Sequence, residues 1–178
     1  MRLVKEGRIV TDRFVRVPDD VSIPRDAAVI VSHGRVLADP AALLREAPTG
    51  VIWPNDRKVA ELAPYLGGLA LVGLVFPVFK DGRAFSQARL LREQYGFAGE
   101  LRATGQVLRD QFLFMLRAGF DAFEVTKEAD AAAFAETVRR YSIFYQPTGD
   151  GRLTVHDARV ERADGTAGPV PETALQAR

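Results

Sequence analysis

Residues 69–119 read LALVGLVFPVFKDGRAFSQARLLREQYGFAGELRATGQVLRDQFLFMLRAG, and the predicted architecture follows from this stretch. It contains two short apolar runs, LALVGLVFP and ELRAT, and each is followed by a longer run with helical spacing. In the second helical run, Leu108, Phe112, Met115 and Leu116 fall at i, i+4, i+7 and i+8, which is one face of a helix. A strand followed by a helix, repeated along the chain, predicts βα units and a mainly parallel sheet.

The same alternation continues on both sides of this stretch. Strand-like runs occur at GVIWP and DAFEV, and helix-like runs occur at DRKVAELAPYL and EADAAAFAETVRRY. A further short apolar run, residues 29–31, lies upstream of them. We therefore predict an α/β fold of alternating βα units with a mainly parallel sheet. Strand count and spacing leave open whether this sheet is flat or curls into half of a barrel.

The two ends of the chain differ from this central pattern. RLVKEGRIVTDRFVRV alternates apolar and polar residues around Glu6 and Gly7, which predicts an N-terminal antiparallel hairpin. SIFYQP and LTVHDARV predict two late strands joined by the turn TGDG. We assign residues 1–160 to a single α/β domain, the size expected of one globular unit, and residues 161–178, poor in apolar side chains, to a disordered tail.

Composition excludes several classes of function. The 178 residues include no cysteine, which removes disulfides, thiolate zinc sites and cysteine-ligated iron–sulfur clusters. His33 and His156 lack metal-like spacing, so no metal site is expected. A net charge of +1 gives no basic field for nucleic acid. Charges interrupt the N-terminus, and the longest apolar run is far shorter than the roughly 20 residues that span a bilayer. We expect a cytoplasmic protein with neither nucleic acid nor membrane as a partner.

The glycines and arginines of the central stretch predict a binding site. In parallel α/β folds, ligands bind at the carboxyl ends of the strands. There, Gly82 and Gly105 lie in two neighbouring loops, and each loop leads into an arginine-bearing helix. A helix N-terminus suits an oxyanion, to which Arg83 and Arg109 would add charge-assisted bonds and Ser86 a hydroxyl donor. The sequence predicts a pocket for a small oxyanion or a phosphate group.

A second interpretation of the same arginines is purely structural. Asp81 and Asp110 lie among them, and exposed arginine–carboxylate pairs are common surface features worth about 0–1 kcal/mol each. Arg102 differs because Leu101 and Ala103 flank it on a strand expected to be covered on both faces. A buried arginine is costly unless it is paired, so Arg102 requires an internal carboxylate or a ligand.

The run from Phe76 to Gln111, continued by RAGFDAFEV, resembles a bacterial family of domains of unknown function. Members of this family are described as oxidoreductases involved in assimilatory sulfite reduction and are often encoded beside other sulfate-reduction enzymes. The resemblance is specific in this segment and extends loosely over about residues 1–145. It assigns no catalytic role, and it falls on Asp81, Gly82, Arg83, Ser86, Arg89, Arg92, Gly99, Glu100, Arg102, Gly105, Arg109 and Asp110.

The resemblance implies a role close to sulfite, which is itself a small oxyanion. Reduction of sulfite to sulfide requires several electrons, and a chain without cysteine cannot ligate the usual sirohaem–cluster machinery with its own thiolates. We therefore expect an accessory protein that acts with sulfite reductase or another sulfur-assimilation enzyme.

The alternative is an independent oxidoreductase or transferase that binds a phosphorylated nucleotide or a flavin at the same loops, because phosphate uses the same donors. The sequence leaves the cofactor open, with a flavin or a nicotinamide nucleotide as the candidates. It also allows a homodimer that covers the edges of an incomplete barrel.

Overall fold

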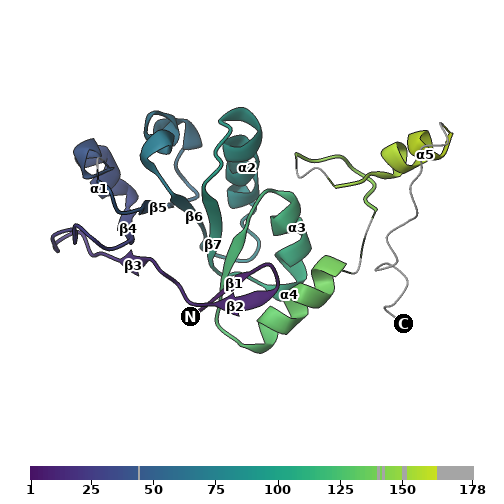
Figure 1. Cartoon of the computed structure of the whole chain (residues 1–178), viewed down its shortest axis with the longest axis horizontal. Coiled ribbons are helices and arrows are strands. Elements are labelled where there is room, and N and C mark those ends of the chain that lie inside the picture. The colour runs from purple at the N-terminus through teal and green to yellow at the C-terminus, as the bar shows by residue number, and fades with distance from the viewer. Residues whose placement is uncertain (44, 140, 142, 150–151, 164–178) are drawn as a thin grey trace.

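The computed structural model describes residues 1–43, 45–139, 141, 143–149 and 152–163 (Figure 1). Their strands form one eight-stranded sheet in the order β2-β1-β8-β7-β6-β5-β4-β3. The strands are β1 Arg2–Lys5, β2 Arg8–Val10, β3 Val15–Arg16, β4 Val29–Ser32, β5 Thr49–Trp53, β6 Leu71–Phe76, β7 Glu100–Gly105 and β8 Ala122–Val125.

The pairing of the strands confirms the predicted fold class. From β3 to β8 each strand is parallel to the next one in the chain, whereas β1 is antiparallel to both β8 and β2. A two-residue turn joins β1 to β2, and both of its residues, Glu6 and Gly7, have positive φ angles of 51° and 75°. Two positive φ values are typical of the tight hairpin turn whose twist matches the flanking strands. The chain is therefore α/β, with a mainly parallel sheet and an N-terminal antiparallel hairpin.

The helical segments lie between successive parallel strands and after the last one. The α-helices are α1 His33–Ala38, α2 Arg83–Arg89, α3 Phe112–Arg117, α4 Ala129–Arg139 and α5 Val155–Ala163. Three segments are 3₁₀-helical and one is π-helical, namely η1 Pro40–Leu43, η2 Val59–Gly68, η4 Arg109–Gln111 and η3 Leu90–Gln94, respectively. The predicted helix DRKVAELAPYL forms η2, where Pro64 lacks the N–H that a regular α-helix would use.

Two observations show that the sheet curls into a half-barrel. Strands β2 and β3 form its two edges, yet only residues 11–14 separate them in the chain, so the edges lie within about 17 Å of each other. Eight flat strands at about 4.8 Å spacing would hold those edges about 34 Å apart. In addition, Arg16 on β3 donates to Glu124 on β8 over 2.7 Å, although four strands lie between them in the sheet.

The two faces of the curled sheet have different contents. The helices cover the outer face, where alternate strand residues such as Trp53, Leu74 and Phe123 join the main apolar core. The inner face holds a small apolar cluster, which consists of Phe14, Ile30 and Leu71 with partly buried neighbours. Its glycines on β5 and β6 make room, because a Cβ at either position would clash with a neighbouring side chain. The inner face also carries charged residues, among them Arg102 and Glu124.

Beyond α4 the chain forms an arm that extends from the body to the right in Figure 1. Of its two predicted strands, only a single bridge between Phe144 and Thr154 is present among the described residues. The strand prediction for LTVHDARV is wrong, because α5 begins at Val155. Thr154 accepts from the Asp157 N–H at 3.2 Å, and Asp157 accepts from the Thr154 N–H at 3.0 Å, which is a reciprocal helix cap.

Two further points concern the predicted tail, residues 161–178, and helices that could span a membrane. Helix α5 extends to Ala163, and the remaining residues of the predicted tail, 164–178, lie outside the described residues. Within the described part of the chain, no helix combines the length and apolar character needed to cross a membrane.

Candidate functional site

The loops at the carboxyl ends of β5, β6 and β7 contact one another directly. The Gln87 amide on α2 donates to the Pro54 carbonyl in the loop after β5, over 3.1 Å. In the loop after β6, the Phe79 N–H donates to the Gln106 side chain at 3.1 Å, and the Phe79 carbonyl accepts from the Gln111 amide at 3.0 Å. These side-chain to backbone bonds hold three successive loops together at one end of the sheet, where the sequence predicts the site.

Gly105 allows the closest of these approaches. Its φ is +92°, a backbone conformation that residues with a side chain rarely adopt, and a Cβ there would overlap the Phe76 carbonyl oxygen. The next residue, Gln106, donates its N–H to that same oxygen at 2.8 Å. The glycine therefore lets the end of β7 pack directly on the end of β6. Gly82, the other predicted glycine, is the N-cap residue directly before α2, and its carbonyl accepts from the Phe85 N–H.

Arg83 and Asp81 form a local bidentate pair beside the start of α2. The guanidinium donates from Nε at 3.0 Å and from Nη2 at 2.7 Å to the two carboxylate oxygens. The Arg83 N–H donates to the same carboxylate at 3.2 Å, so Asp81 caps the helix. These bonds, led by the one from the guanidinium, hold the pKa of Asp81 well below its usual range. The side chain of Arg83 remains 57 % exposed.

The other predicted residues at this end are open to solvent. Ser86 on α2 and Arg109 and Asp110 in η4 are all exposed. Within the described part of the chain, no hydrogen bond or ion pair is recorded for the Arg109 side chain. Because η4 follows the loop that Gly105 packs against β6, Arg109 projects from the same end of the sheet as Arg83. The structure thus places five of the predicted side chains on neighbouring loops.

Buried polar atoms without a partner also gather at this end. Among the described residues, four buried side-chain atoms have no hydrogen-bond partner, namely Trp53 Nε1, Asn55 Nδ2, Gln87 Oε1 and Gln111 Oε1. Trp53 ends β5 and Asn55 lies two residues beyond it, while both glutamines hold the converging loops. The Asn55 side chain helps to lower the pKa of Asp81. Among the described residues, however, its amide nitrogen has no hydrogen-bond partner at standard distance and angle. Such atoms are rare in native proteins and indicate a group that the protein itself does not supply.

Arg102 lies away from these loops, on the inner face of the half-barrel. It is fully buried, and its guanidinium contacts three carboxylates: Asp12 at 2.5 Å, Glu100 at 2.8 Å and Glu124 at 3.3 Å. The sequence predicts either an internal carboxylate or a ligand as the partner of Arg102, and in the structure its partners are internal carboxylates. Burial alone raises the pKa of Asp12, but bonds from Arg102 and from the Phe14 N–H outweigh it, so that this pKa lies below its usual value.

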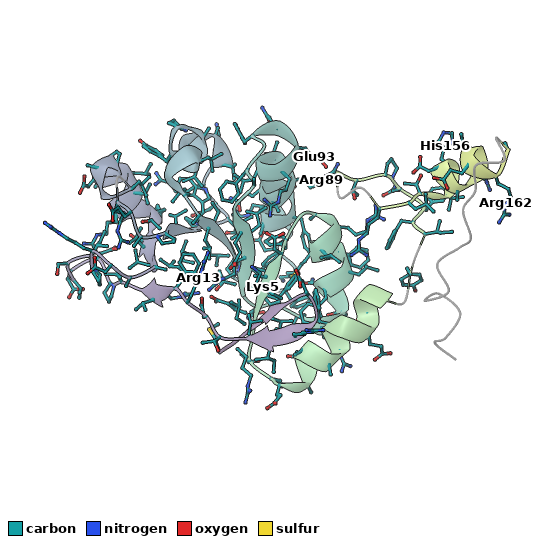
Figure 2. The ribbon with its side chains drawn as sticks, viewed as in Figure 1. Lys5, Arg13, Arg89, Glu93, His156 and Arg162 are labelled. Atoms are coloured by element: carbon teal, nitrogen blue, oxygen red, sulfur yellow. The ribbon has the colours of Figure 1, made fainter. Side chains whose placement is uncertain are left out.

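Two more cations complete this inner-face network. Lys5 on β1, labelled in Figure 2, pairs with Glu100 at 2.9 Å, and Arg16 on β3 pairs with Glu124 at 2.6 Å. The Thr104 hydroxyl also donates to Glu124 at 2.6 Å. Three cations therefore face three carboxylates, which leaves the network without net charge. Sequence reasoning found Arg102 but missed Asp12 and Arg16, because their contacts span about 90 and 110 positions of the chain.

No group of three or more potential metal ligands occurs among the described residues.

The fold and the loop contacts define a half-barrel α/β protein with incompletely paired polar groups at the carboxyl end of its sheet. Residues 50–156 match the family described as "Bacterial protein of unknown function (DUF934)", and because this match covers more than half of the chain, the protein belongs to that family. The matched region runs from β5 to the first turn of α5 and includes all the loops above. A comparison with curated proteins found no match.

Proposed function

We propose that this protein is an accessory protein of assimilatory sulfite reduction and that it binds a small oxyanion at the carboxyl-end loops. One observation carries the binding part of the proposal: among the described residues, the buried N–H donors of Trp53 and Asn55 have no hydrogen-bond partner of standard geometry, at the end of the sheet where Arg83 and Arg109 are exposed. An unsatisfied buried donor costs about 1–3 kcal/mol, which a bound acceptor would offset. An oxyanion supplies several acceptors and a charge opposite to that of the arginines.

The arginine charges and the fixed hydrogen-bond donors at this end of the sheet together favour a small anion. Asp81 neutralises part of the Arg83 charge, whereas none of the described residues forms an ion pair with Arg109. Donors that come from a buried indole and amide are fixed in direction, so they suit a compact group such as sulfite, sulfate or phosphate. The link to sulfite reduction itself comes from the family resemblance of this segment. The absence of cysteine favours a role beside the reductase over the redox step.

Calorimetric titration with sulfite, sulfate and phosphate tests the binding step. We expect saturable binding of sulfite to the wild-type protein and weaker binding in the Asn55→Ala and Arg109→Ala variants. Arg25→Ala is the matched control, because Arg25 is an exposed arginine that precedes β4 at the opposite end of the sheet. Equal affinity in all four proteins would refute this location for the site.

Growth of a gene-deletion strain tests the physiological step. If the proposal is correct, the strain grows on sulfide but not on sulfate or sulfite, and the wild-type gene restores growth. A gene that encodes the Arg83→Ala, Arg109→Ala double variant should yield a folded protein that fails to restore it. Normal growth of the deletion strain on all three sulfur sources would contradict the proposed role.

The competing proposal, an enzyme that uses a nucleotide or flavin at these loops, predicts a different pattern. A purified protein that carries yellow flavin absorbance, or one that binds nucleotides but not sulfite in the same titrations, would support that enzyme over the accessory role.

A further inference from the structure

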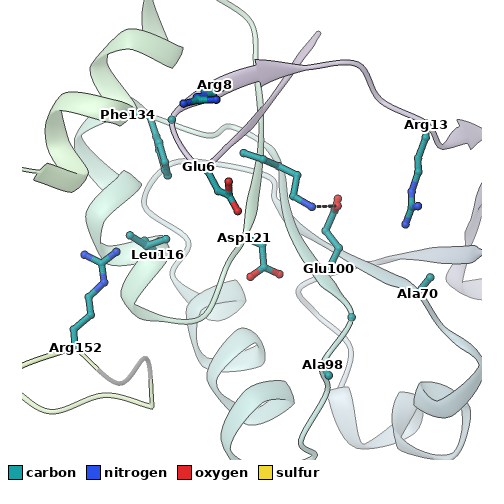
Figure 3. A pocket seen from close by; sticks show the side chains of 13 residues that line it. Glu6, Arg8, Arg13, Ala70, Ala98, Glu100, Leu116, Asp121, Phe134 and Arg152 are labelled. Carbon is teal, nitrogen blue, oxygen red and sulfur yellow. Dashed lines mark hydrogen bonds and ion pairs between the residues drawn. The ribbon is translucent and has the colours of Figure 1, made fainter.

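A second hollow lies at the opposite end of the sheet, away from the carboxyl-end loops (Figure 3). Its volume is about 1000 Å³, at the upper end of the range for small-molecule sites. Ala70, Gly99 and Asp121, which line it, directly precede β6, β7 and β8, so the hollow lies at the amino ends of these parallel strands. The turn between β1 and β2 and the connector between β2 and β3 also line the cavity. The N-terminal hairpin therefore builds a cavity that the βα units alone would not have.

The acidic groups of this amino-end cavity are largely neutralised by the protein. Glu100 accepts from Lys5 at 2.9 Å, a contact drawn as a dashed line in Figure 3, and it also pairs with Arg102. Asp121 accepts from Arg92 at 2.5 Å and from the Leu101 N–H of β7 at 2.8 Å. Neither carboxylate therefore attracts a further cation strongly.

Of the three arginines in the lining, Arg152 has its guanidinium 5.7 Å from the centroid of the Phe144 ring, and the other two, Arg8 and Arg13, have no carboxylate partner among the described residues. Arg8 on β2 is exposed, and no hydrogen bond or ion pair is recorded for it within the described chain. The Arg13 guanidinium lies 5.1 Å from the centroid of the Phe14 ring. Figure 3 shows Arg8 and Arg13 on opposite sides of the cavity. Glu6, at the tip of the turn, is the remaining acid in the lining. The charges of Arg8, Arg13 and Glu6 therefore sum to a net positive charge, and the two arginines lie apart in the lining.

The lining is partly apolar on the side of the cavity that carries Arg8. Phe134 of α4 and Leu116 of α3 line the cavity, and in Figure 3 Phe134 lies beside Arg8. An inorganic ion would fill only a small part of this volume and would contact one arginine at a time. An organic molecule with an anionic group at each end would reach both guanidinium groups, and its part near Arg8 would pack against the apolar lining.

We propose that the amino-end cavity binds an elongated organic bisphosphate, with one phosphate on Arg8 and the other on Arg13. Arginine suits phosphate because its planar guanidinium donates two parallel hydrogen bonds. This site is separate from the proposed oxyanion site, because the two lie at opposite ends of the strands and share no residue. The protein would therefore respond to an organic phosphate independently of sulfite.

Titration at physiological ionic strength with three probes of increasing charge separation tests this proposal. The probes are inorganic phosphate, fructose 6-phosphate and fructose 1,6-bisphosphate. We expect the bisphosphate to bind about tenfold more tightly than the monophosphate, since it gains a second charge-assisted contact. In both Arg8→Ala and Arg13→Ala proteins, the bisphosphate should bind no better than the monophosphate. Both side chains are exposed, so these variants should melt at the wild-type temperature without ligand.

Arg109→Ala is the matched control, because it removes an exposed arginine from the other end of the sheet. It should leave bisphosphate binding unchanged, whereas Arg8→Ala should leave sulfite binding unchanged. The two proposals can therefore fail separately. The bisphosphate site is overturned if the bisphosphate binds no tighter than the monophosphate, or if its affinity is the same in the Arg8→Ala and Arg13→Ala proteins as in the wild type.

Discussion

Replacing Arg102 by methionine removes the buried cation of the inner-face network but keeps a side chain of similar length. Loss of one partner from a buried ion pair generally costs about 3–5 kcal/mol, because the opposite charge stays buried. Glu100 and Glu124 each retain one other cation, and Asp12 is about one-third exposed, so water can solvate it. We therefore expect a loss near the lower limit, about 3 kcal/mol of unfolding free energy.

Urea unfolding followed by the fluorescence of Trp53, the single tryptophan, measures this loss. With a slope of about 1–3 kcal/mol per molar urea, the midpoint should fall by about 1–3 M. Arg89→Met is the matched control, because Arg89 pairs with Glu93 on an exposed helix surface at 3.2 Å. Such an exposed pair contributes about 0.3–0.5 kcal/mol, so the control midpoint should hardly move.

The pH dependence of the Arg102→Met effect follows from the lowered pKa of Asp12. A carboxyl group whose pKa is lowered by folding stabilises the protein above its unfolded pKa, about 3.9 for aspartate. That contribution is lost as the pH falls through the folded value. The variant lacks most of the contribution, so the difference in stability between wild type and variant should be largest near pH 7 and shrink below about pH 4. Equal stability at pH 7, or a difference that grows on acidification, would refute this account of the network.

Three further predictions concern other parts of the molecule. Gly105→Ala should lower the unfolding free energy by more than about 1 kcal/mol in thermal melts, since φ is +92° and the Phe76 carbonyl fills the space; an unchanged melt would contradict this. In carbon-13 NMR titrations, Arg83→Ala should raise the pKa of Asp81 toward its ordinary value, and a pKa that stays low would exclude the guanidinium as its main cause. Thr154→Ala should speed amide hydrogen exchange in α5 but not in β6, because it removes a helix-capping hydroxyl.

The sequence predicts the parallel strands β4 to β8 well because their signal is local, whereas β3, which pairs with β4 in parallel, was included in the predicted antiparallel hairpin. Each is a short apolar run bounded by turn-forming residues, and alternation with helical runs sets their order and direction. The strand prediction for LTVHDARV failed where two local signals competed. Alternation favoured a strand, but Thr154 and Asp157 have the spacing of a reciprocal helix cap, and the cap prevailed. At Pro64, similarly, helical periodicity was correct while the missing N–H changed the type of helix.

The candidate site was predictable in location but not in its contacts. Loop positions and helix starts place Arg83 and Arg109 at the carboxyl end, since every parallel strand points the same way. The missing partners of Trp53 and Asn55 depend on three-dimensional packing, which no spacing in the sequence reveals. The partners of Arg102 were out of reach for a related reason. Glu124 shares its face of the sheet, but Asp12 approaches only because the sheet curls.

The pairing of the first strand, β1, with the last strand, β8, also sets the order in which the sheet can be completed during synthesis. Strands β1 and β2 are synthesised first, yet β1 pairs with β8, which is the last strand of the sheet to leave the ribosome. The N-terminal hairpin must therefore wait, with its sheet edge uncovered, until residues 122–125 have emerged. Contacts between such distant parts of a chain slow folding, so we expect the half-barrel to close only after most of the chain has been translated.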